Sequence, residues 1–340
     1  MINDNYLLHE MIDAIEEEVS RILNSLNNNI TDKYYEMVAY QFGFSENDKH
    51  SENRGKMIRP LLLLFCSNSN ASSKSWENAI PAAAAVELLH NFSLVHDDIQ
   101  DKSPTRRKRP TIWKKWGIPQ AINTGDGLFS MANISIGNLI EHYPAESVIK
   151  VMEVFNKTCL DLTRGQFLDI SFEQKEIISL EQYWTMIGFK TAALFSTSAE
   201  IGAILSGIEA QEQMNFRKFG YDLGLAFQIK DDILGMWGLE EKTGKSITKD
   251  LETAKMTLPV VFGLQNSKIF TERWEKKVIS RSDAISLSEQ LKIDGAWKYS
   301  QDLVRNLTDE ALATLEKLPI SKENYKNLYN LSTSLLDRET

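Results

Sequence analysis

Apolar residues recur at helical spacing along most of the chain. One face of a helix over residues 6–26 would carry Leu7, Leu8, Met11, Ile12, Ile15, Val19 and Ile22. A stretch rich in Ala and Leu predicts a second long helix over residues 79–101. The same spacing predicts helices over 118–140, 144–174, 179–207 and 209–237, and amphipathic helices over 254–337. The pattern indicates an all-helical protein.

Polar stretches separate the first helices. Residues 44–55 and 67–75 are polar and aperiodic, so we expect loops there. Pro60 suits the first turn of a helix, where its missing N–H costs nothing, and a buried helix then begins with Leu61–Cys66. A segment with two glycines, residues 238–246, breaks the later helical series.

Residues that form turns are scarce. The 17 Gly and 8 Pro make up about 7% of the 340 residues, against roughly 12% in an average protein. A β-sandwich or barrel needs a turn roughly every 8–12 residues, so this shortage favours long helices. Apolar residues are 42% of the chain, enough for a large core. No stretch reads as a linker, which predicts a single domain over residues 1–340.

Net charge and cysteine content limit the partners and the cellular compartment that the sequence allows. The chain has 38 Lys and Arg against 47 Asp and Glu, and its net charge of −9 would repel a nucleic acid. Cys66 and Cys159 lack metal-ligand spacing, so we expect buried free thiols. Acidic residues interrupt the first 19 positions, unlike a signal peptide, and no apolar run approaches the ~20 residues of a membrane span. We expect a cytoplasmic protein.

Two acidic motifs are the first candidate chemistry. Asp97 and Asp101 are four residues apart and share one helix face, while Asp98 lies about 100° round the helix. Asp231 and Asp232 close another long helix. Carboxylates without a Cys or His cluster favour Mg²⁺, and two facing motifs could hold two or three such ions with substrate phosphates. The alternative is a solvated acidic helix end.

A basic segment follows the first motif directly. Residues 102–110 contain no acid and carry Lys102, Arg106, Arg107, Lys108 and Arg109. Guanidinium groups bind phosphate through two parallel hydrogen bonds, so the segment is typical of a diphosphate site. A solvated basic loop is the alternative. His90 lies seven residues before Asp97 on the same face, and taken alone it is as typical of a core histidine.

Together these motifs resemble the trans-isoprenyl diphosphate synthases, the polyprenyl synthetase family, over about residues 50–262. The resemblance rests on Gly55–Pro60, Glu87–His90, Asp97–Asp101, Arg106-Arg107, Gly125-Asp126, Gly165-Gln166 with Asp169, Phe189–Thr191, Phe227–Asp232 and Thr243–Lys245. It implies the all-α isoprenoid synthase fold, a class I terpenoid synthase bundle around a deep central cavity, assembled as a homodimer. Residues 263–340 match only as helices.

The resemblance also implies an activity and a set of site residues. The activity is a Mg²⁺-dependent prenyltransferase that condenses isopentenyl diphosphate with an allylic diphosphate. The implied Mg²⁺ ligands are Asp97, Asp101 and Asp231, supported by Asp98 and Asp232. The implied contacts of the allylic diphosphate are Arg106, Lys190, Thr191, Gln228, Lys245 and Lys255. The implied isopentenyl diphosphate site consists of Lys56, Arg59, His90 and Arg107.

The second motif departs from the family pattern. It usually ends in a third aspartate, and here Gly235 stands in that place. We expect activity to survive, with weaker metal binding. Two other functions stay open. A terpene cyclase on the same fold would not need the isopentenyl diphosphate residues, and a non-catalytic regulatory subunit would not need the aspartates, of which five of six remain.

The residues before Asp97 predict the product. In the resembled family the positions five and four before the first aspartate limit the chain length, and here they are Phe92 and Ser93. This pattern implies geranylgeranyl diphosphate (C20) as the main product and farnesyl diphosphate (C15) as the runner-up. We predict that Phe92→Ala lengthens the products and that Ser93→Phe shortens them, as measured by chromatography. If both variants keep the wild-type distribution, the limit lies elsewhere.

Overall fold

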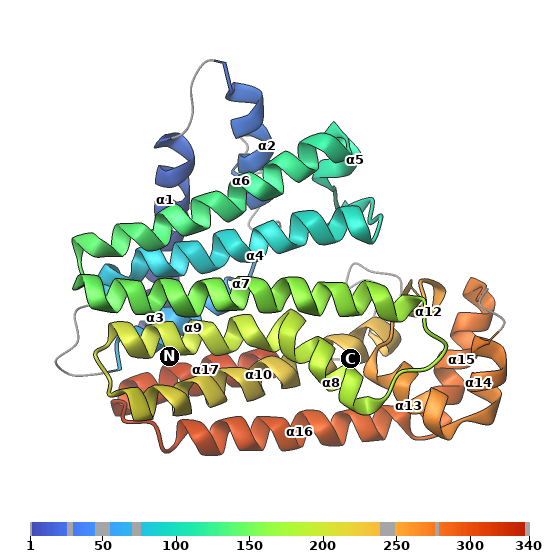
Figure 1. The fold of residues 1–340 in the computed structure, drawn as a ribbon. Coiled ribbons are helices and arrows are strands. Elements are labelled where there is room, and N and C mark those ends of the chain that lie inside the picture. The colour runs from blue at the N-terminus through green and yellow to red at the C-terminus, as the bar shows by residue number, and fades with distance from the viewer. Residues whose placement is uncertain are drawn as a thin grey trace. The chain divides into compact units, whose positions relative to one another are not determined.

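The computed structural model describes residues 2–25, 30–44, 55–69, 76–238, 249–275 and 279–336 (Figure 1). Within these ranges nearly every element is a helix, and the only sheet is one short hairpin. The all-helical prediction is therefore confirmed. The predicted loops over 44–55 and 67–75 and the break at 238–246 lie largely outside the described residues.

The residues group into two compact units. The first contains Met1–Cys159, Thr197–Met214 and Pro319–Leu328, and the second contains Leu160–Ser196, Asn215–Leu318 and Tyr329–Thr340. Each unit is assembled from three stretches of the chain, and four long helices contribute residues to both: α7 (Ala145–Glu173), α9 (Ala193–Leu205), α10 (Ala210–Trp237) and α17 (Lys322–Leu336). The single domain over residues 1–340 stays a prediction.

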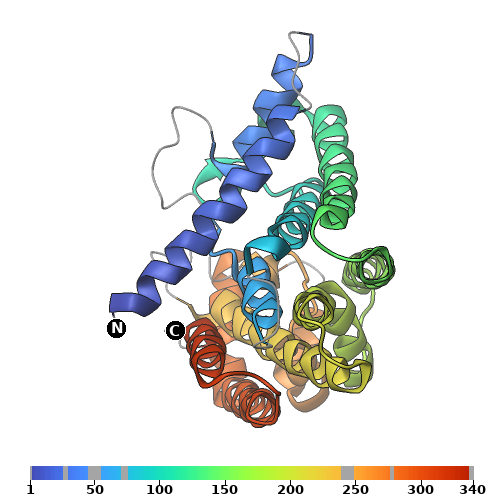
Figure 2. The same cartoon turned by 90° about the vertical axis from the view of Figure 1, so that its left-hand side faces the viewer.

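The first unit is built around one buried helix. Helix α4 (Ile80–Gln100) contacts α1 (Ile2–Ser25), α3 (Ile58–Ser67) and α6 (Ile118–Gly137). Figure 2 shows α1, in dark blue, as one uninterrupted helix. The predicted apolar face of α1 is buried from its middle onward, at Met11, Ile15, Val19 and Ile22, whereas Leu7, Leu8 and Ile12 are half-buried. The shorter elements are α2 (Asp32–Phe42), α5 (Ile112–Trp116), η3 (Trp76–Ala79) and η4 (Asn138–Glu141).

Small side chains allow the other helices of the first unit to pack closely around α4. The five residues Ala82–Val86 are completely buried, because four alanines let neighbouring helices approach from every side. The Ser135 hydroxyl donates to the Pro81 carbonyl oxygen at 2.6 Å and fixes α6 to the start of α4. These contacts hold the N-terminal half of α4 in the core of the first unit.

The basic segment 102–110 contains a short β-hairpin. Strands β1 (Thr105–Arg106) and β2 (Arg109–Pro110) pair antiparallel, and the two-residue turn between them is Arg107-Lys108. Both turn residues are left-handed, with φ of 50° and 62°, where such hairpins ordinarily use Asn or Gly. The Thr111 hydroxyl and the Trp113 indole N–H each donate to the Ser103 carbonyl at 2.8 Å. These contacts fix the segment's cations in space.

The second unit contains the remaining helices and one π-helical turn. Its helices are α8 (Leu180–Ile187), α12 (Lys249–Glu252), α13 (Leu258–Asn266), α14 (Lys268–Trp274), α15 (Arg281–Ile293) and α16 (Ala296–Leu315). The sequence predicts one helix over 179–207, but a π-turn, η5 (Gly188–Ala192), interrupts it. A Cβ at Gly165 of α7 would lie 2.2 Å from the Lys190 backbone nitrogen, so only glycine allows α7 to approach this turn.

The cysteine prediction is confirmed. Cys66 and Cys159 are buried free thiols, and burial raises the pKa of Cys159 to about 12, so the thiol stays protonated. Across the described ranges, no helix combines the length and apolar character needed to cross a bilayer.

Candidate functional site

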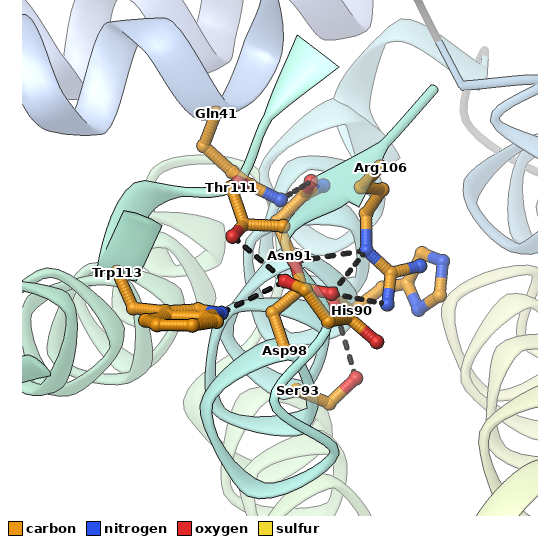
Figure 3. A network of polar contacts seen from close by, with 9 residues as sticks. Gln41, His90, Asn91, Ser93, Asp98, Arg106, Thr111 and Trp113 are labelled. Carbon is orange, nitrogen blue, oxygen red and sulfur yellow. Dashed lines mark hydrogen bonds and ion pairs between the residues drawn. The ribbon is translucent and has the colours of Figure 1, made fainter. Parts of the chain in front are cut away.

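Asp98 binds Arg106 inside the first unit. Only 3% of Asp98 is exposed, and the Arg106 guanidinium donates from Nε to both carboxylate oxygens at 3.0 Å and from Nη2 to Oδ1 at 2.9 Å (Figure 3). A buried carboxylate needs such a partner, because an unpaired charge in the interior is costly. The arrangement agrees with the supporting role expected for Asp98.

Asp97 and Asp101 occupy a different face of the same helix end. Both are half-buried, and the Asp101 N–H donates to the Asp97 carbonyl oxygen at 2.8 Å, so Asp101 closes the last turn of α4. Lys102 follows in a left-handed conformation that ends the helix. The four-residue spacing leaves two carboxylates on one face, which is a suitable pair of hard oxygen donors for a divalent ion.

Arg59, His90 and Arg107 gather beside this helix end. Arg59 Nη1 lies 3.4 Å from His90 Nε2. Burial lowers the pKa of His90 well below its usual value, and the charges of Arg59, Arg107 and Arg106 lower it further. The imidazole is therefore neutral at pH 7 and can accept a hydrogen bond from Arg59. Lys56, the fourth predicted residue, is exposed just before α3.

A buried polar chain lies behind these cations. Asn91 donates to the Glu87 carboxylate at 2.8 Å, and Gln41 of α2 donates to Asn91 at 3.1 Å. Burial raises the pKa of Glu87, while the hydrogen bond from Asn91 and the charges of Arg107 and Arg59 oppose this effect. Glu87 is thus the acidic neighbour of the arginine pair. The sequence predicts no role for Glu87, although the motif Glu87–His90 belongs to the family resemblance.

In the second unit, two predicted lysines share one carboxylate. Lys190 Nζ lies 2.6 Å and Lys255 Nζ 2.9 Å from Asp169 Oδ2, and Lys255 also contacts Glu173 at 2.6 Å. Burial pushes the pKa of Asp169 upward, but the two lysines outweigh burial and hold that pKa below its usual value. A phosphate could replace Asp169 as their partner. No role is predicted from the sequence for Asp169 or Glu173, although Asp169 belongs to the motifs of the family resemblance.

Asp232 is fixed by three donors. Its carboxylate accepts hydrogen bonds from Gln228 Nε2 at 2.8 Å, the Tyr183 hydroxyl at 2.7 Å and the Leu258 N–H at 2.8 Å. Burial raises its pKa to about 7, although these hydrogen bonds lower it. The Thr191 hydroxyl donates to Gln228 Oε1 at 2.5 Å. Asp232 therefore links α8, α10 and α13 and orients the predicted pair Gln228 and Thr191.

The remaining predicted residues do not belong to the groups described above. Asp231 is half-buried at the end of α10, next to Asp232. The Phe92 ring lies 4.8 Å from the His96 ring and 5.3 Å from the Phe129 ring of α6, between the two helices. The Ser93 hydroxyl donates to the His90 carbonyl at 2.7 Å. Lys245 lies outside the described residues.

Comparison with known proteins places these features in a family. A family model described as polyprenyl synthetase matches residues 45–291. Geranylgeranyl diphosphate synthase of Sulfolobus acidocaldarius is 34% identical, with 90% of this chain and 88% of that protein covered. (2E,6E)-Farnesyl diphosphate synthase of Mycobacterium bovis is 31% identical, covering 89% and 86%. The crystal structure of geranylgeranyl pyrophosphate synthetase from Pyrococcus horikoshii Ot3 matches with a TM-score of 0.87 at 31% identity, covering 99% of each chain.

The contacts of Asp232 predict a stability effect. Tyr183 is fully buried, so Tyr183→Phe removes a donor from a carboxylate that water cannot reach. We predict a loss of about 1–3 kcal/mol in the free energy of unfolding, measured by urea denaturation. Tyr6→Phe, at a side chain 74% exposed, is the control and should change it by less than about 0.5 kcal/mol. Equal values for the two variants would contradict the role of Tyr183.

Proposed function

The chain belongs to the polyprenyl synthetase family and is a short-chain trans-prenyl diphosphate synthase, and we propose that it joins isopentenyl diphosphate to an allylic diphosphate to give mainly geranylgeranyl diphosphate. The observation that supports this proposal is the group Arg59, His90 and Arg107, a set of cations gathered around His90 of the helix that carries Asp97 and Asp101. A cyclase that uses one diphosphate substrate has no need for this second cationic group.

The family uses Mg²⁺, and the carboxylates present suit it. We propose that Asp97 and Asp101 of one motif and Asp231 of the other are ligands of two or three ions. These side chains are half-buried and offer hard oxygen donors. The hydrogen bonds that Asp98 and Asp232 accept suit a supporting role for those two residues. When bound, Mg²⁺ neutralises the charge that develops on departing pyrophosphate.

The side chains of the chain itself position and activate both substrates. Arg106, Lys190, Lys255, Thr191, Gln228 and Lys245 bind the allylic diphosphate and stabilise the pyrophosphate as its C–O bond breaks. Lys56, Arg59, His90 and Arg107 hold isopentenyl diphosphate so that its double bond attacks the allylic cation and forms the new C–C bond. The released pyrophosphate takes the proton that is then lost. Apolar side chains around the growing chain exclude water.

Exposed apolar side chains support a homodimer. On α6, η4 and the first part of α7, within the first unit, the large exposed residues are Ile118, Ile122, Ile134, Ile140, Ile149 and Met152. Such a set is typical of a surface that a second copy covers. Sedimentation equilibrium would measure the mass. The two buried free thiols support a cytoplasmic location.

The direct test of the proposed function is product analysis. Purified protein is incubated with Mg²⁺, isopentenyl diphosphate and each allylic primer in turn, and the product length is measured. The proposal expects C20 products with smaller amounts of C15. A product formed from the allylic diphosphate alone would indicate a cyclase, and turnover only with a partner protein would indicate a regulatory subunit.

The metal assignment predicts a loss of turnover. Asp97→Ala should leave a folded protein whose turnover falls at least ~100-fold, because a contact that stabilises the transition state is lost. Steady-state kinetics measures the effect, and circular dichroism checks the fold. The control is Asp13→Ala, at an exposed position of α1, which should keep wild-type turnover. Near-normal activity of the Asp97 variant would refute the assignment.

The second cationic group predicts a selective effect on one substrate. Arg59→Gln or His90→Ala should raise the apparent KM for isopentenyl diphosphate more than the KM for the allylic substrate. Lys114→Gln, which removes an exposed cation of α5 in the same unit, is the matched control and should change neither value. Equal increases for both substrates would contradict the assignment of Arg59 and His90 to the isopentenyl diphosphate site.

A further inference from the structure

Helix α2 is fixed to the basic hairpin by reciprocal contacts between Tyr40 and strand β2. The Arg109 guanidinium donates from Nη2 to the Tyr40 carbonyl oxygen at 3.0 Å, and its central carbon lies 3.9 Å from the centre of the Tyr40 ring. The Tyr40 hydroxyl in turn donates to the Pro110 carbonyl oxygen at 2.8 Å. Separating α2 from β2 would therefore break two hydrogen bonds and a cation–π contact.

The hairpin needs support from outside itself. Each of its strands has two residues, and a hairpin of that size is not stable in water on its own. The turn residues Arg107 and Lys108 are left-handed, a conformation that persists only where surrounding contacts impose it. Asp98 holds Arg106 of strand β1, and α2 holds strand β2. Contacts on both strands thus flank the turn that carries Arg107.

The same end of α2 is also fixed to α4. Gln41, the residue after Tyr40, donates to the buried Asn91 of α4 at 3.1 Å (Figure 3). Asn91 directly follows His90, so this contact holds α2 to α4 one residue away from the imidazole. Tyr40 and Gln41 line one small pocket together with Arg107. The end of α2 therefore joins the hairpin to the part of α4 that carries His90.

We propose that Tyr40 and Arg109 are positioning residues for the binding of isopentenyl diphosphate. By fixing strand β2 to α2, they hold the turn in the conformation that places Arg107 beside His90. Neither side chain has to touch the substrate for this role. Arg109 then has a function in the basic segment that differs from phosphate binding.

The proposal implies a selective effect on one substrate. Arg106 keeps its own contact with Asp98 when the contact with α2 is lost, so Arg107 should be displaced more than Arg106. Affinity for isopentenyl diphosphate should then fall while affinity for the allylic diphosphate is largely kept. This inference rests on the proposed function through the assignment of Arg107 to isopentenyl diphosphate.

Direct binding tests the proposal without turnover. Isothermal titration calorimetry measures the dissociation constant of isopentenyl diphosphate for the wild type, Arg109→Met and Tyr40→Leu. We expect each variant to bind it at least about fivefold more weakly, because a displaced guanidinium no longer meets the diphosphate. The KM for the allylic substrate should change less than about twofold. Wild-type affinity in both variants, or equal losses for the two substrates, would overturn the proposal.

A control variant and a double variant separate positioning from charge. Lys115→Met removes a cation that lies 4.3 Å from the centre of the same Tyr40 ring but belongs to α5, and it should bind like the wild type. The double variant Arg109→Met with Tyr40→Leu should bind within about twofold of the weaker single variant, because both changes remove one shared contact. Losses that multiply in the double variant would overturn the proposal.

Arg107→Gln distinguishes failure of this inference from failure of the proposed function. If Arg107→Gln weakens binding of isopentenyl diphosphate while Arg109→Met and Tyr40→Leu do not, only the inference about α2 fails. If Arg107→Gln binds like the wild type, the assignment of Arg107 is wrong and the inference fails with it. Circular dichroism checks the fold of each variant. If Tyr40→Leu does not fold, Arg109→Met, which leaves α2 unchanged, decides the test.

Discussion

Each aspartate motif contains one buried carboxylate whose hydrogen bonds organise the surrounding elements. Asp98 holds Arg106 of the hairpin, and Asp232 holds Tyr183, Gln228 and the start of α13. A buried carboxylate without donors would be strongly destabilising, so these contacts tie the hairpin and the start of α13 to the two helices. The neighbouring aspartates, Asp97 and Asp231, lie on other helix faces and are half-buried.

Acidic side chains likewise hold the cations of the candidate site in place. Lys190 and Lys255 meet at Asp169, and Arg59 and Arg107 lie near Glu87. Without these acids the like charges would repel one another and the side chains would spread into solvent. The acidic partners therefore keep positively charged groups close together before any diphosphate arrives. A diphosphate then meets an arrangement that is already formed, which reduces the ordering that binding requires.

The sequence predicted the features that depend on local pattern. Helix α4 was expected over 79–101 and spans Ile80–Gln100, and the buried thiols were expected from their apolar surroundings. Contacts between distant residues were missed, because a single sequence contains no signal for them. Tyr183 and Asp232 are 49 positions apart, and Gln41 and Asn91 are 50 apart. The left-handed turn at Arg107-Lys108 was missed for a different reason, since neither residue is typical of that conformation.

The π-turn at Gly188–Ala192 makes this part of the chain sensitive to length. A π-turn contains one residue more than an α-helical turn, and each residue of an α-helix rotates the following side chains by about 100°. Deleting one residue there would join α8 and α9 into a regular helix and would turn Lys190 or Thr191 away from its partner. Substitutions around the turn change single contacts, whereas a one-residue deletion would change the phase of every side chain beyond it. Related chains that keep this chemistry should therefore keep the number of residues in the turn as well as Lys190 and Thr191.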